Sequence, residues 1–315
     1  MSTLVVVSGA SKGFGRALAL AWVLQTRSPL HVRLVGRDEV GLQETKRVLE
    51  EKAVGGRSLV VETLMLDLGE VGALTTVASA MFNLPTSAPE GSIFKVVFYN
   101  NAGTLGPLAG VGCYSGDMLK ELTAAINLNV TSSCFLTADL LQRCQEDGEY
   151  TRAGVKKVAI VNVSSLAAVQ PFESWGIYCA GKAAREMFHR CLSQECAKRL
   201  PSLPNVRVLN YAPGPLDTNM QQEIREGPAV DKDTQEFYRG LKEKNQLVSP
   251  AESAAKVTKI LLFEKYDNGD HIDFYDKAPE YPETSSCCSC TTCTCGVDCS
   301  CGPGVPQCAD CATKK

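Results

Sequence analysis

Short apolar segments alternate with helical patterns along most of this chain. The apolar segments are rich in Val, Ile and Leu and lie at residues 3–8, 31–36, 58–66, 93–103, 155–165, 205–214 and 270–276. Helical spacing fills the intervals, near 38–52, 70–82, 115–143, 176–199 and 250–264, with two or three short helices in 217–247. Apolar strands that alternate with helices indicate a parallel sheet covered on both faces. The sequence therefore predicts a doubly wound α/β fold of about seven parallel strands, which binds ligands beyond the carboxyl ends of its strands.

Composition divides the chain into a body and a tail. Residues 1–277 carry the alternating pattern and are predicted to form a single domain, and residues 278–286 form a linker rich in Pro, Ser and Glu. Residues 287–315 hold nine of the 15 cysteines and almost no apolar side chains, so they cannot bury a core. The other six cysteines show no metal-like spacing. They are interpreted as core or surface thiols rather than as a disulfide framework.

The bulk properties narrow the classes of partner. A net charge of −3, with 44% hydrophobic and 21% charged residues, indicates neither a nucleic acid nor an anionic membrane surface. The first residues lack the basic segment and cleavage site of a secretory signal. No stretch reaches the roughly 18 to 20 apolar residues of a membrane span. We therefore expect a soluble cytoplasmic protein.

A glycine-rich turn, GASKGFG at residues 9–15, joins the first predicted strand to the first helix. Gly9 allows the tight turn. Gly13 and Gly15 let the backbone approach a pyrophosphate at the helix N-terminus, where unpaired N–H groups favour anions. The spacing is GxxxGxG rather than the general GxGxxG, and an ordinary strand–helix turn is the alternative. The turn indicates a Rossmann-type nucleotide site with candidate cofactor contacts at Gly9, Ser11, Lys12, Gly13, Phe14 and Gly15.

The residues after the second and third strands bear on the choice of nucleotide. An acidic residue after the second strand holds the ribose 2′-hydroxyl of NAD, whereas an arginine accommodates the 2′-phosphate of NADP. Here Arg37 comes first and Asp38 second, and Lys12 adds a positive charge nearby. We predict NADP(H), with a merely solvated Arg37 as the alternative. Asp67 and Leu68 are candidates to lie beside the adenine, although Asp67 is equally suited to cap a helix.

Tyr178 and Lys182 lie at positions i and i+4 of a predicted helix and so face the same side of it. A phenol has an unperturbed pKa of about 10, and a neighbouring ammonium lowers that pKa by stabilising the phenolate. Such a phenol can protonate the alkoxide that forms when hydride reaches a carbonyl carbon. Ser164 and Ser165 end the fifth predicted strand, and a serine hydroxyl there can hydrogen-bond the carbonyl. This set indicates carbonyl reduction, while the YxxxK spacing alone would also suit an ordinary helix surface.

Together with NNAG at 100–103, NLNVTS at 127–132 and PGPLDT at 213–218, these motifs resemble the short-chain dehydrogenase/reductase family over roughly residues 3–277. Ser165 is preferred to Ser164 because it lies at the family's usual distance from the tyrosine. The resemblance implies a catalytic tetrad of Asn129, Ser165, Tyr178 and Lys182. It implies further cofactor contacts at Asn101, Lys182, Leu216 and Thr218. It also implies a homodimer or homotetramer that pairs through the helices of 115–143 and 176–199.

Longer strings resemble a narrower group within the family. SGASKGFGRALA at 8–19, NVSSLAAVQPFESWGIYCAGKAARE at 162–186 and DHIDFYDK at 270–277 are most similar to members that reduce side-chain ketones of pterins in tetrahydrobiopterin synthesis. The resemblance implies substrate contacts at Ser164, Ser165, Tyr178, Gly214 and Asp273. The carboxylate of Asp273 would suit the 2-amino group and N3–H of a pterin, and a solvated strand end is the alternative. Residues 106–130 carry no distinctive string, so other small ketones or dicarbonyls stay open as substrates.

The tail segment CCSCTTCTCGVDCSCGPGVPQCADC at 287–311 repeats the spacings CxC and CxxC. In a reducing compartment this density favours metal-bound thiolates over disulfides. The segment resembles a metallothionein, which implies Zn or Cu(I) held by Cys287, Cys288, Cys290, Cys293, Cys295, Cys299, Cys301, Cys308 and Cys311. A thiol-rich tail without a metal is one alternative. Another is a metal-buffering protein whose reductase body is only a carrier, although a carrier would have no use for an intact catalytic set.

Overall fold

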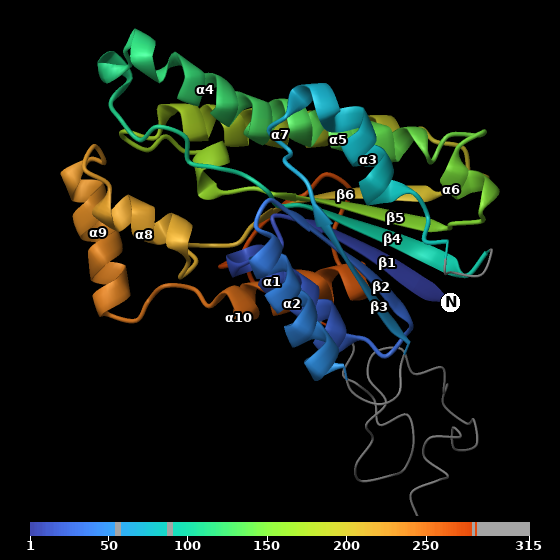
Figure 1. Cartoon of the computed structure of the whole chain (residues 1–315). Coiled ribbons are helices and arrows are strands. Elements are labelled where there is room, and N and C mark those ends of the chain that lie inside the picture. Colours follow the sequence, from blue (N-terminus) through green and yellow to red (C-terminus); the bar gives the residue numbers. More distant parts are fainter. Residues whose placement is uncertain (54–57, 87–90, 279–280, 282–315) are drawn as a thin grey trace, which may run out of the picture.

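The computed structural model of the chain describes residues 1–53, 58–86, 91–278 and 281 (Figure 1). The strands are β1 Ser2–Ser8, β2 Leu30–Gly36, β3 Leu59–Met65, β4 Ile93–Asn100, β5 Lys157–Val163, β6 Asn205–Ala212 and β7 His271–Asp273. The α-helices are α1 Gly13–Gln25, α2 Glu39–Lys52, α3 Leu74–Phe82, α4 Leu119–Ile126, α5 Ser133–Gln142, α6 Glu149–Arg152, α7 Gly176–Cys196, α8 Asn219–Glu226, α9 Lys232–Glu243 and α10 Pro250–Leu262. The nine tail cysteines and most of the predicted linker lie outside the described residues.

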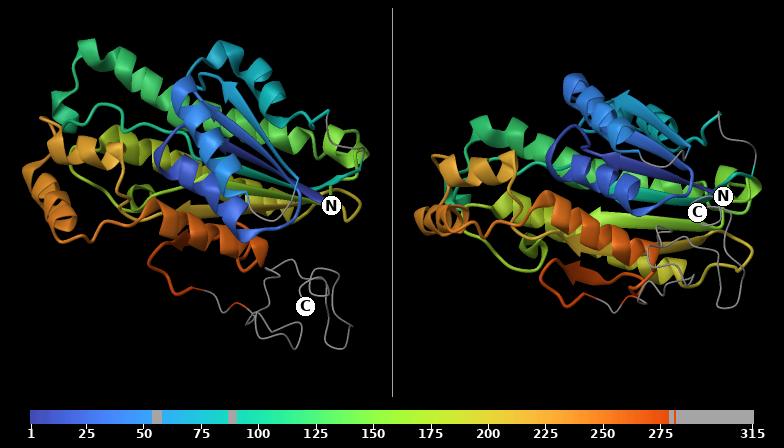
Figure 2. Two further views of the ribbon diagram at one scale, coloured as in Figure 1. Left: turned by 60° about the horizontal axis from the view of Figure 1, so that its bottom comes forward. Right: turned by 90° about the horizontal axis from the view of Figure 1, so that it is seen from below.

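The strands form one seven-stranded parallel sheet in the order β3-β2-β1-β4-β5-β6-β7. Helices α1, α2 and α10 cover one face, and α3, α5 and α7 cover the other (Figures 1 and 2). The predicted doubly wound α/β fold is confirmed. The strand order reverses between β1 and β4, and in open α/β sheets ligands bind at such a point, outside the carboxyl ends of the strands.

Both faces of the sheet are buried, which explains the continuous apolar strands. In β1, Val5 and Val7 join the core beneath α1 and α10, whereas Leu4 and Val6 join the core beneath α3 and α5. Successive side chains of a strand point to opposite faces, so a strand buried on both sides has no polar alternation. Each face therefore has its own core, and the sheet divides them.

The region predicted as one long helix over 115–143 changes type along its length. A 3₁₀ turn at Gly116–Met118 leads into α4, and a π-helical segment at Asn127–Ser132 joins α4 to α5. Such π segments are rare and frequently mark functional sites. This one carries Asn129, a member of the predicted tetrad. The short helix α6 was not predicted.

A third apolar cluster lies beyond the carboxyl ends of the strands, on the side where Figure 1 shows α8 and α9. Its buried members are Leu105, Ala167, Trp175, Tyr178, Ile224 and Val230. Tyr178 belongs to the predicted tetrad. The cluster therefore places an apolar wall directly at the candidate catalytic residue.

Two predictions made from the sequence, on membrane spans and on the body cysteines, concern residues that the structure describes. Within it, no helix combines the length and the apolarity that crossing a bilayer requires. The six cysteines of the body are free thiols, and Cys144 and Cys196 are buried among core side chains. This agrees with their interpretation as packing or surface residues.

Candidate active site

The glycine turn is folded tightly between β1 and α1. Gly9 has a φ of 69° and Gly13 a φ of 56°, in the left-handed region that glycine enters without steric cost. A Cβ on Gly15 would lie 2.1 Å from the carbonyl oxygen of Gly9, so any side chain there would push α1 away from the turn. Asn101 supports the turn, because its Nδ2 donates to the carbonyl oxygen of Ser8 at 2.8 Å.

The N-terminus of α1 is open to an anion. Its cap residue, Lys12, makes no side-chain capping hydrogen bond, and the first N–H groups of a helix have no partner within the helix. A Cβ on Gly13 would have Thr218 as its nearest neighbour, at 3.5 Å, so the loop after β6 faces the glycine turn. These features fit the pyrophosphate of a dinucleotide.

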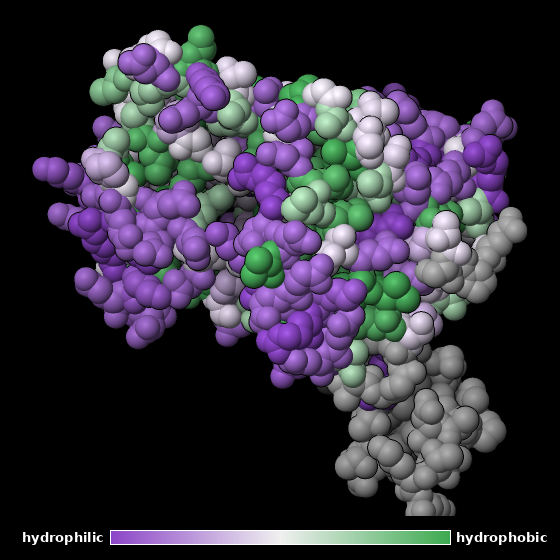
Figure 3. Space-filling view, viewed as in Figure 1, coloured by the Kyte–Doolittle hydropathy of each residue, from purple (hydrophilic) through white to green (hydrophobic). Residues whose placement is uncertain are grey.

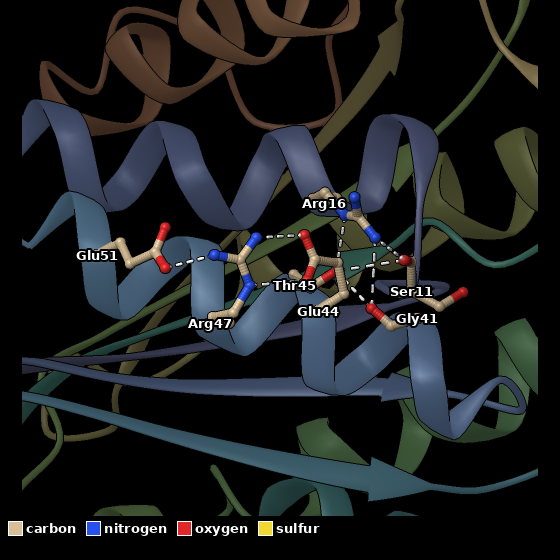
Figure 4. A network of polar contacts seen from close by, with 7 residues as sticks. All are labelled: Ser11, Arg16, Gly41, Glu44, Thr45, Arg47 and Glu51. Atoms are coloured by element: carbon tan, nitrogen blue, oxygen red, sulfur yellow. Dashed lines mark hydrogen bonds and ion pairs between the residues drawn. The ribbon is translucent and has the colours of Figure 1, made fainter.

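A polar network that sequence analysis did not identify ties the glycine turn to α2. It consists of Ser11, Arg16, Gly41, Glu44, Thr45, Arg47 and Glu51 (Figure 4). Arg16 donates from Nη2 to the carbonyl oxygen of Ser11 at 2.7 Å and from Nε to Oγ1 of Thr45 at 2.9 Å. Thr45 is fully buried and donates to backbone carbonyls of both segments. Within the network, Arg16 and Thr45 hold the turn beside the start of α2, whereas Arg47 pairs only with Glu44 and Glu51 of its own helix.

Arg37 and Asp38 have different surroundings at the end of β2. Asp38 is the N-cap of α2, and its Oδ1 accepts a 3.0 Å hydrogen bond from a backbone N–H of the first turn. The side chain of Arg37 is 72% exposed, and its Nη1 lies 3.7 Å from Oδ2 of Asp67. Asp67 also accepts a 2.8 Å bond from a backbone N–H two residues later, and Leu68 is buried. The Asp38 carboxylate caps its own helix, so the exposed guanidinium of Arg37 is the charged group that this corner offers to a ligand.

The structure brings Tyr178, Lys182 and Ser165 together. Tyr178 and Lys182 are one turn apart on α7 and are 7% and 5% exposed. Nζ of Lys182 lies 5.6 Å from the centroid of the Tyr178 ring and donates a 2.7 Å hydrogen bond to the carbonyl oxygen of Val163, which ends β5. Ser165 follows two residues later, and its hydroxyl is near enough to Tyr178 to act on the pKa of the phenol. Its Oγ also accepts a 3.1 Å bond from Ala167 N–H, which orients the hydroxyl.

Burial controls the protonation of this set. It raises the pKa of Tyr178 to about 12, and the hydrogen bond with Ser165 and the charge of Arg185 oppose the shift only in part. Burial also lowers the pKa of Lys182 well below its usual value, and Arg185 adds to that effect. The expected lowering of the phenol pKa by the ammonium is therefore not met, because desolvation of the phenolate dominates. At neutral pH Tyr178 is a protonated phenol, the form that can donate a proton.

Asn129 uses its whole amide to hold the segment after β4. Its Oδ1 accepts from Thr104 N–H at 2.9 Å, and its Nδ2 donates to the Thr104 carbonyl oxygen at 2.8 Å. A Cβ on Gly181 would lie 3.1 Å from Cβ of Asn129, so α7 packs closely against the π segment beside Lys182. Asn129 thus joins the loop after β4 to the catalytic helix.

Sequence analysis also did not identify a row of buried asparagine side chains beneath the site. Asn100, Asn162 and Asn210 are register neighbours on β4, β5 and β6 and are nearly inaccessible. Arg185 of α7, fully buried, donates from Nε to Oδ1 of Asn162 at 3.0 Å and to two carbonyl oxygens at the end of β4. The sequence signal is an Asn after two apolar residues in each strand, as FYN, IVN and VLN. The row fastens α7 to the ends of three strands.

Stacked aromatic side chains form a wall next to Tyr178. The Trp175 ring stacks on Phe172 with centroids 5.0 Å apart and on Tyr238 at 5.8 Å, and it meets Tyr178 edge-on at 5.9 Å. Trp175 Nε1 and both amide atoms of Gln221, on α8, are buried without a hydrogen-bond partner among the described residues. Buried polar groups are nearly always paired, so these groups are candidates to meet a ligand. No sequence signal pointed to Gln221.

Gly214 lies against Phe274, the residue that follows Asp273, near the edge of the sheet formed by β7. Gly214 has a φ of 78°, and a Cβ on it would lie 3.4 Å from Cβ of Phe274. Phe274 N–H donates to the Ala212 carbonyl oxygen at 2.8 Å, which holds the end of β7 against β6. Asp273 is partly exposed, and its Oδ1 accepts a 2.9 Å bond from a backbone N–H two residues later. The carboxylate is therefore oriented but still accessible.

Two predicted site residues have other contacts. The hydroxyl of Ser164, which is 2% exposed, donates to Oε2 of Glu186. Leu216 pairs through its backbone with Val248 and packs against the core beneath α1 and α10.

Comparison with known proteins agrees with this geometry. A family model described as short chain dehydrogenase matches residues 3–229. The sepiapterin reductase of Bos taurus is 40% identical over 272 residues, which cover 86% of this chain and 93% of that protein. The enzyme of the same name from Mus musculus is 40% identical over 270 residues, covering 85% and 94%. A benzil reductase ((S)-benzoin forming) of Bacillus cereus is 26% identical, covering 85% and 97%.

Solved structures show the same fold. The KRED1-Pglu enzyme superposes with a TM-score of 0.66 at 26% identity, over 86% of this chain and 100% of that one. An actinorhodin polyketide ketoreductase with NADPH has a TM-score of 0.65 at 20% identity, over 87% and 95%. The chain therefore belongs to the short-chain dehydrogenase family of oxidoreductases, and within that family it is a homologue of the sepiapterin reductases.

Proposed function

We propose that this protein is an NADPH-dependent carbonyl reductase of the sepiapterin reductase type, which reduces side-chain ketones of pterins as in tetrahydrobiopterin synthesis. The observation that carries the proposal is the set formed by Tyr178 and Lys182, which are buried, and Ser165, which is partly exposed, beside an aromatic wall. Homology to sepiapterin reductases over 86% of the chain supports the substrate class.

The cofactor would be held by the glycine turn and the corner after β2. The open N-terminus of α1 suits the pyrophosphate, with Gly13 and Gly15 allowing close approach. Arg37, exposed and positively charged, suits a ribose 2′-phosphate. When bound, the cofactor supplies the hydride for the carbonyl carbon. The residues of the chain then need only bind, orient and protonate.

Tyr178 supplies the proton that completes the alcohol. Its pKa of about 12 keeps the hydroxyl protonated at neutral pH. Ser165 would hydrogen-bond the carbonyl oxygen as negative charge develops there, and Tyr178 Oη would pass its proton to that oxygen. Lys182, anchored on the Val163 carbonyl, stands close enough to stabilise the phenolate that remains.

Substrate recognition would combine a flat surface with a carboxylate. A pterin is a planar ring, which suits the stack of Phe172, Trp175 and Tyr238. Its 2-amino group and N3–H form a donor edge that Asp273 can accept in bidentate fashion. The unpaired amide of Gln221 offers further hydrogen bonds to the heteroatoms of the ring.

The direct test is oxidation of NADPH by the purified chain with sepiapterin, followed by the absorbance of the reduced nicotinamide. A simple dicarbonyl is assayed beside it. Turnover of sepiapterin with a kcat/KM well above that of the dicarbonyl is expected. Turnover of the dicarbonyl alone would overturn the pterin assignment and leave the reductase chemistry standing.

Replacing Arg37 with Ala should reduce the preference for NADPH over NADH by about 10- to 100-fold, the range for one lost hydrogen bond to a charged group. The ratio of kcat/KM for the two cofactors measures this preference. Arg47→Ala is the matched control, because Arg47 is an exposed arginine of α2 paired with Glu44 and Glu51. An unchanged ratio in the Arg37 variant would show that the guanidinium does not hold the phosphate.

A reductase of small ketones or dicarbonyls is the second candidate. The observation that favours it is the similarity to benzil reductases, at 26% identity over 85% of the chain. The aromatic wall would suit their apolar rings as well as it suits a pterin. The two candidate functions differ in whether Asp273 contributes to substrate binding, and the Asp273→Asn variant tests this difference.

We also propose that the nine cysteines of residues 287–311 bind Zn or Cu(I) in the cytoplasm, where thiols stay reduced. The support is their CxC and CxxC spacing. Deletion of residues 278–315 should abolish metal uptake, measured by elemental analysis after dialysis, and leave kcat/KM for carbonyl reduction within about twofold. Full metal content in the truncated chain would contradict the assignment. A loss of reductase activity would instead show that the body depends on the tail.

We further propose a homodimer or homotetramer that pairs through α4, α5 and α7. Leu119 is 65% exposed, Met187 56% and Phe135 38%, one on each of these helices. Figure 3 shows apolar side chains exposed among polar ones on the side that carries α4 and α5. The molar mass in solution tests this proposal, and a strictly monomeric chain would contradict it.

A further inference from the structure

A chain of three polar residues, of which Ser164 and Glu186 are buried and His271 is partly exposed, links β7 to the helix α7. Glu186 of α7 is 5% exposed, and its Oε1 lies 2.6 Å from Nδ1 of His271, the first residue of β7. Its Oε2 accepts a hydrogen bond from the hydroxyl of Ser164, directly after β5. One carboxylate therefore joins the end of β5, the middle of α7 and the start of β7.

Each member of this chain stands next to a residue of the proposed site. Glu186 lies one turn after Lys182 and on the same face of α7. Ser164 precedes Ser165. His271 lies two residues before Asp273, so both side chains leave the strand on the same face. Glu186 is thus a direct link between the strand that carries Asp273 and the helix that carries Tyr178 and Lys182.

The strand β7 is held by β6, by backbone hydrogen bonds that flank it at Asp270 and Phe274, and by Lys256. It is three residues long, lies at the edge of the sheet and pairs with β6 alone among the described strands. Beyond it, Lys256 of α10 donates to the carbonyl oxygens of Phe274 at 2.8 Å and Asp276 at 2.6 Å. A short edge strand opens more easily than a central one, so the contact at its start helps to hold its position.

The charges around the contact favour a protonated His271. The hydrogen bond and charge of Glu186 raise the pKa of His271 against the effect of burial, and Asp273 and Asp276 act in the same direction. Its register partner on β6 is the neutral Asn210. The cation on the neighbouring α10, Lys256, is directed at backbone carbonyls of the turn after β7.

Glu186 is held in its charged form. Burial by itself raises the pKa of Glu186, but the hydrogen bonds from His271 and Ser164 outweigh it, and Arg190 of α7 adds to their effect. The result is a pKa below the usual value. A buried carboxylate that lost its partner would keep its desolvation cost, so the two charges depend on each other.

We propose that the Glu186–His271 pair is a positioning device that fixes Asp273 relative to Tyr178, and that substrate affinity through Asp273 weakens when His271 loses its proton. The substrate readout rests on the proposed pterin function. The structural readout, which is the protection of the β7 amides from hydrogen exchange, does not depend on that function.

The pH dependence has a definite sign. Because the pKa of His271 is raised, the ion pair is complete below that pKa and is lost as the pH rises through it. The KM for sepiapterin should therefore increase over this interval. The KM for a small dicarbonyl, which has no donor edge for Asp273, should not follow.

Two substitutions at His271 separate the charge from the contact. In His271→Asn the side-chain amide keeps an N–H near the place of Nδ1 but carries no charge, so KM should equal at every pH the value that the wild type reaches above the pKa of His271. In His271→Leu the donor is lost, and KM for sepiapterin should rise about tenfold or more with kcat changed by less than about threefold.

Glu195→Gln, an exposed position of α7, is the control for Glu186→Gln. The double variant Glu186→Gln/His271→Leu should be no worse than the poorer single variant, because both remove one contact.

Amide hydrogen exchange of residues 270–277 in the ligand-free chain provides the independent measurement. His271→Leu should exchange about tenfold faster there than the wild type, while α1 and β1 keep their protection. Unchanged exchange together with an unchanged KM would overturn the positioning role. If the wild type does not reduce sepiapterin, the proposed function fails, and the exchange result still decides the positioning role.

Discussion

The Tyr178→Phe variant is expected to lose about 10²- to 10⁴-fold in kcat for carbonyl reduction, the usual contribution of a positioned general acid. The substitution removes the hydroxyl that Ser165 orients and leaves the aromatic ring in its packing against Trp175. Thermal stability should change little, because the ring fills the same volume. Steady-state kinetics with saturating NADPH measure the effect.

The matched control for this variant is Tyr266→Phe. Tyr266 is also a buried tyrosine, but it lies against Arg207 near the amino ends of the strands, far from the proposed chemistry. Its kcat should remain within about twofold of the wild type. A Tyr178 variant that kept more than a tenth of the wild-type kcat would show that another group donates the proton.

The Asp273→Asn variant should lower kcat/KM for sepiapterin by about 10²-fold or more, mostly through KM, and leave the dicarbonyl unaffected. Asparagine keeps an oxygen for the backbone N–H that Asp273 holds at 2.9 Å, so the turn after β7 should survive. It replaces the other acceptor with a donor, which would face the donor edge of the pterin. A hydrogen bond to a charged group contributes about 1.5–3 kcal/mol; the bond to the replaced oxygen would be lost, and the bond to the remaining oxygen would lose its charge.

The control for Asp273 is Asp267→Asn, an exposed aspartate of the preceding turn. It should leave both substrates unchanged. Equal losses for sepiapterin and the dicarbonyl in the Asp273 variant would point to a damaged site rather than to a lost anchor. No loss for either substrate would remove Asp273 from the binding site and favour the broader carbonyl reductase.

Much of the proposed active site could be predicted because its motifs are local. The glycine turn lies within seven residues of sequence, and its strain at Gly9 and Gly13 is a property of that short backbone segment. Tyr178 and Lys182 are one helical turn apart, so their common face follows from helix geometry. The carboxyl ends of parallel strands share one edge of the sheet, which explains why the predicted residues after β1, β5 and β6 meet.

Local patterns were less informative about protonation. An ammonium next to a phenol suggested a lowered pKa, whereas burial raises the pKa of Tyr178 to about 12. The amine of Lys182 is hydrogen-bonded to the Val163 carbonyl, 19 residues away in sequence. How deeply two side chains are buried depends on all the residues packed around them. The spacing of two residues in the sequence therefore does not predict their burial or their pKa values.

The sequence by itself determined the order of strands and helices, the nucleotide turn and the spacing of the tyrosine and lysine, because each depends on residues within a few positions of one another. The tertiary structure alone decided which distant groups pair. Glu186 meets His271 across 85 residues, and Arg185 meets the Asn100 carbonyl across the same separation. Such contacts form only when the sheet order brings β4, β5, β6 and β7 beside α7. A polar residue in a single sequence does not reveal whether its partner is water or a buried charge.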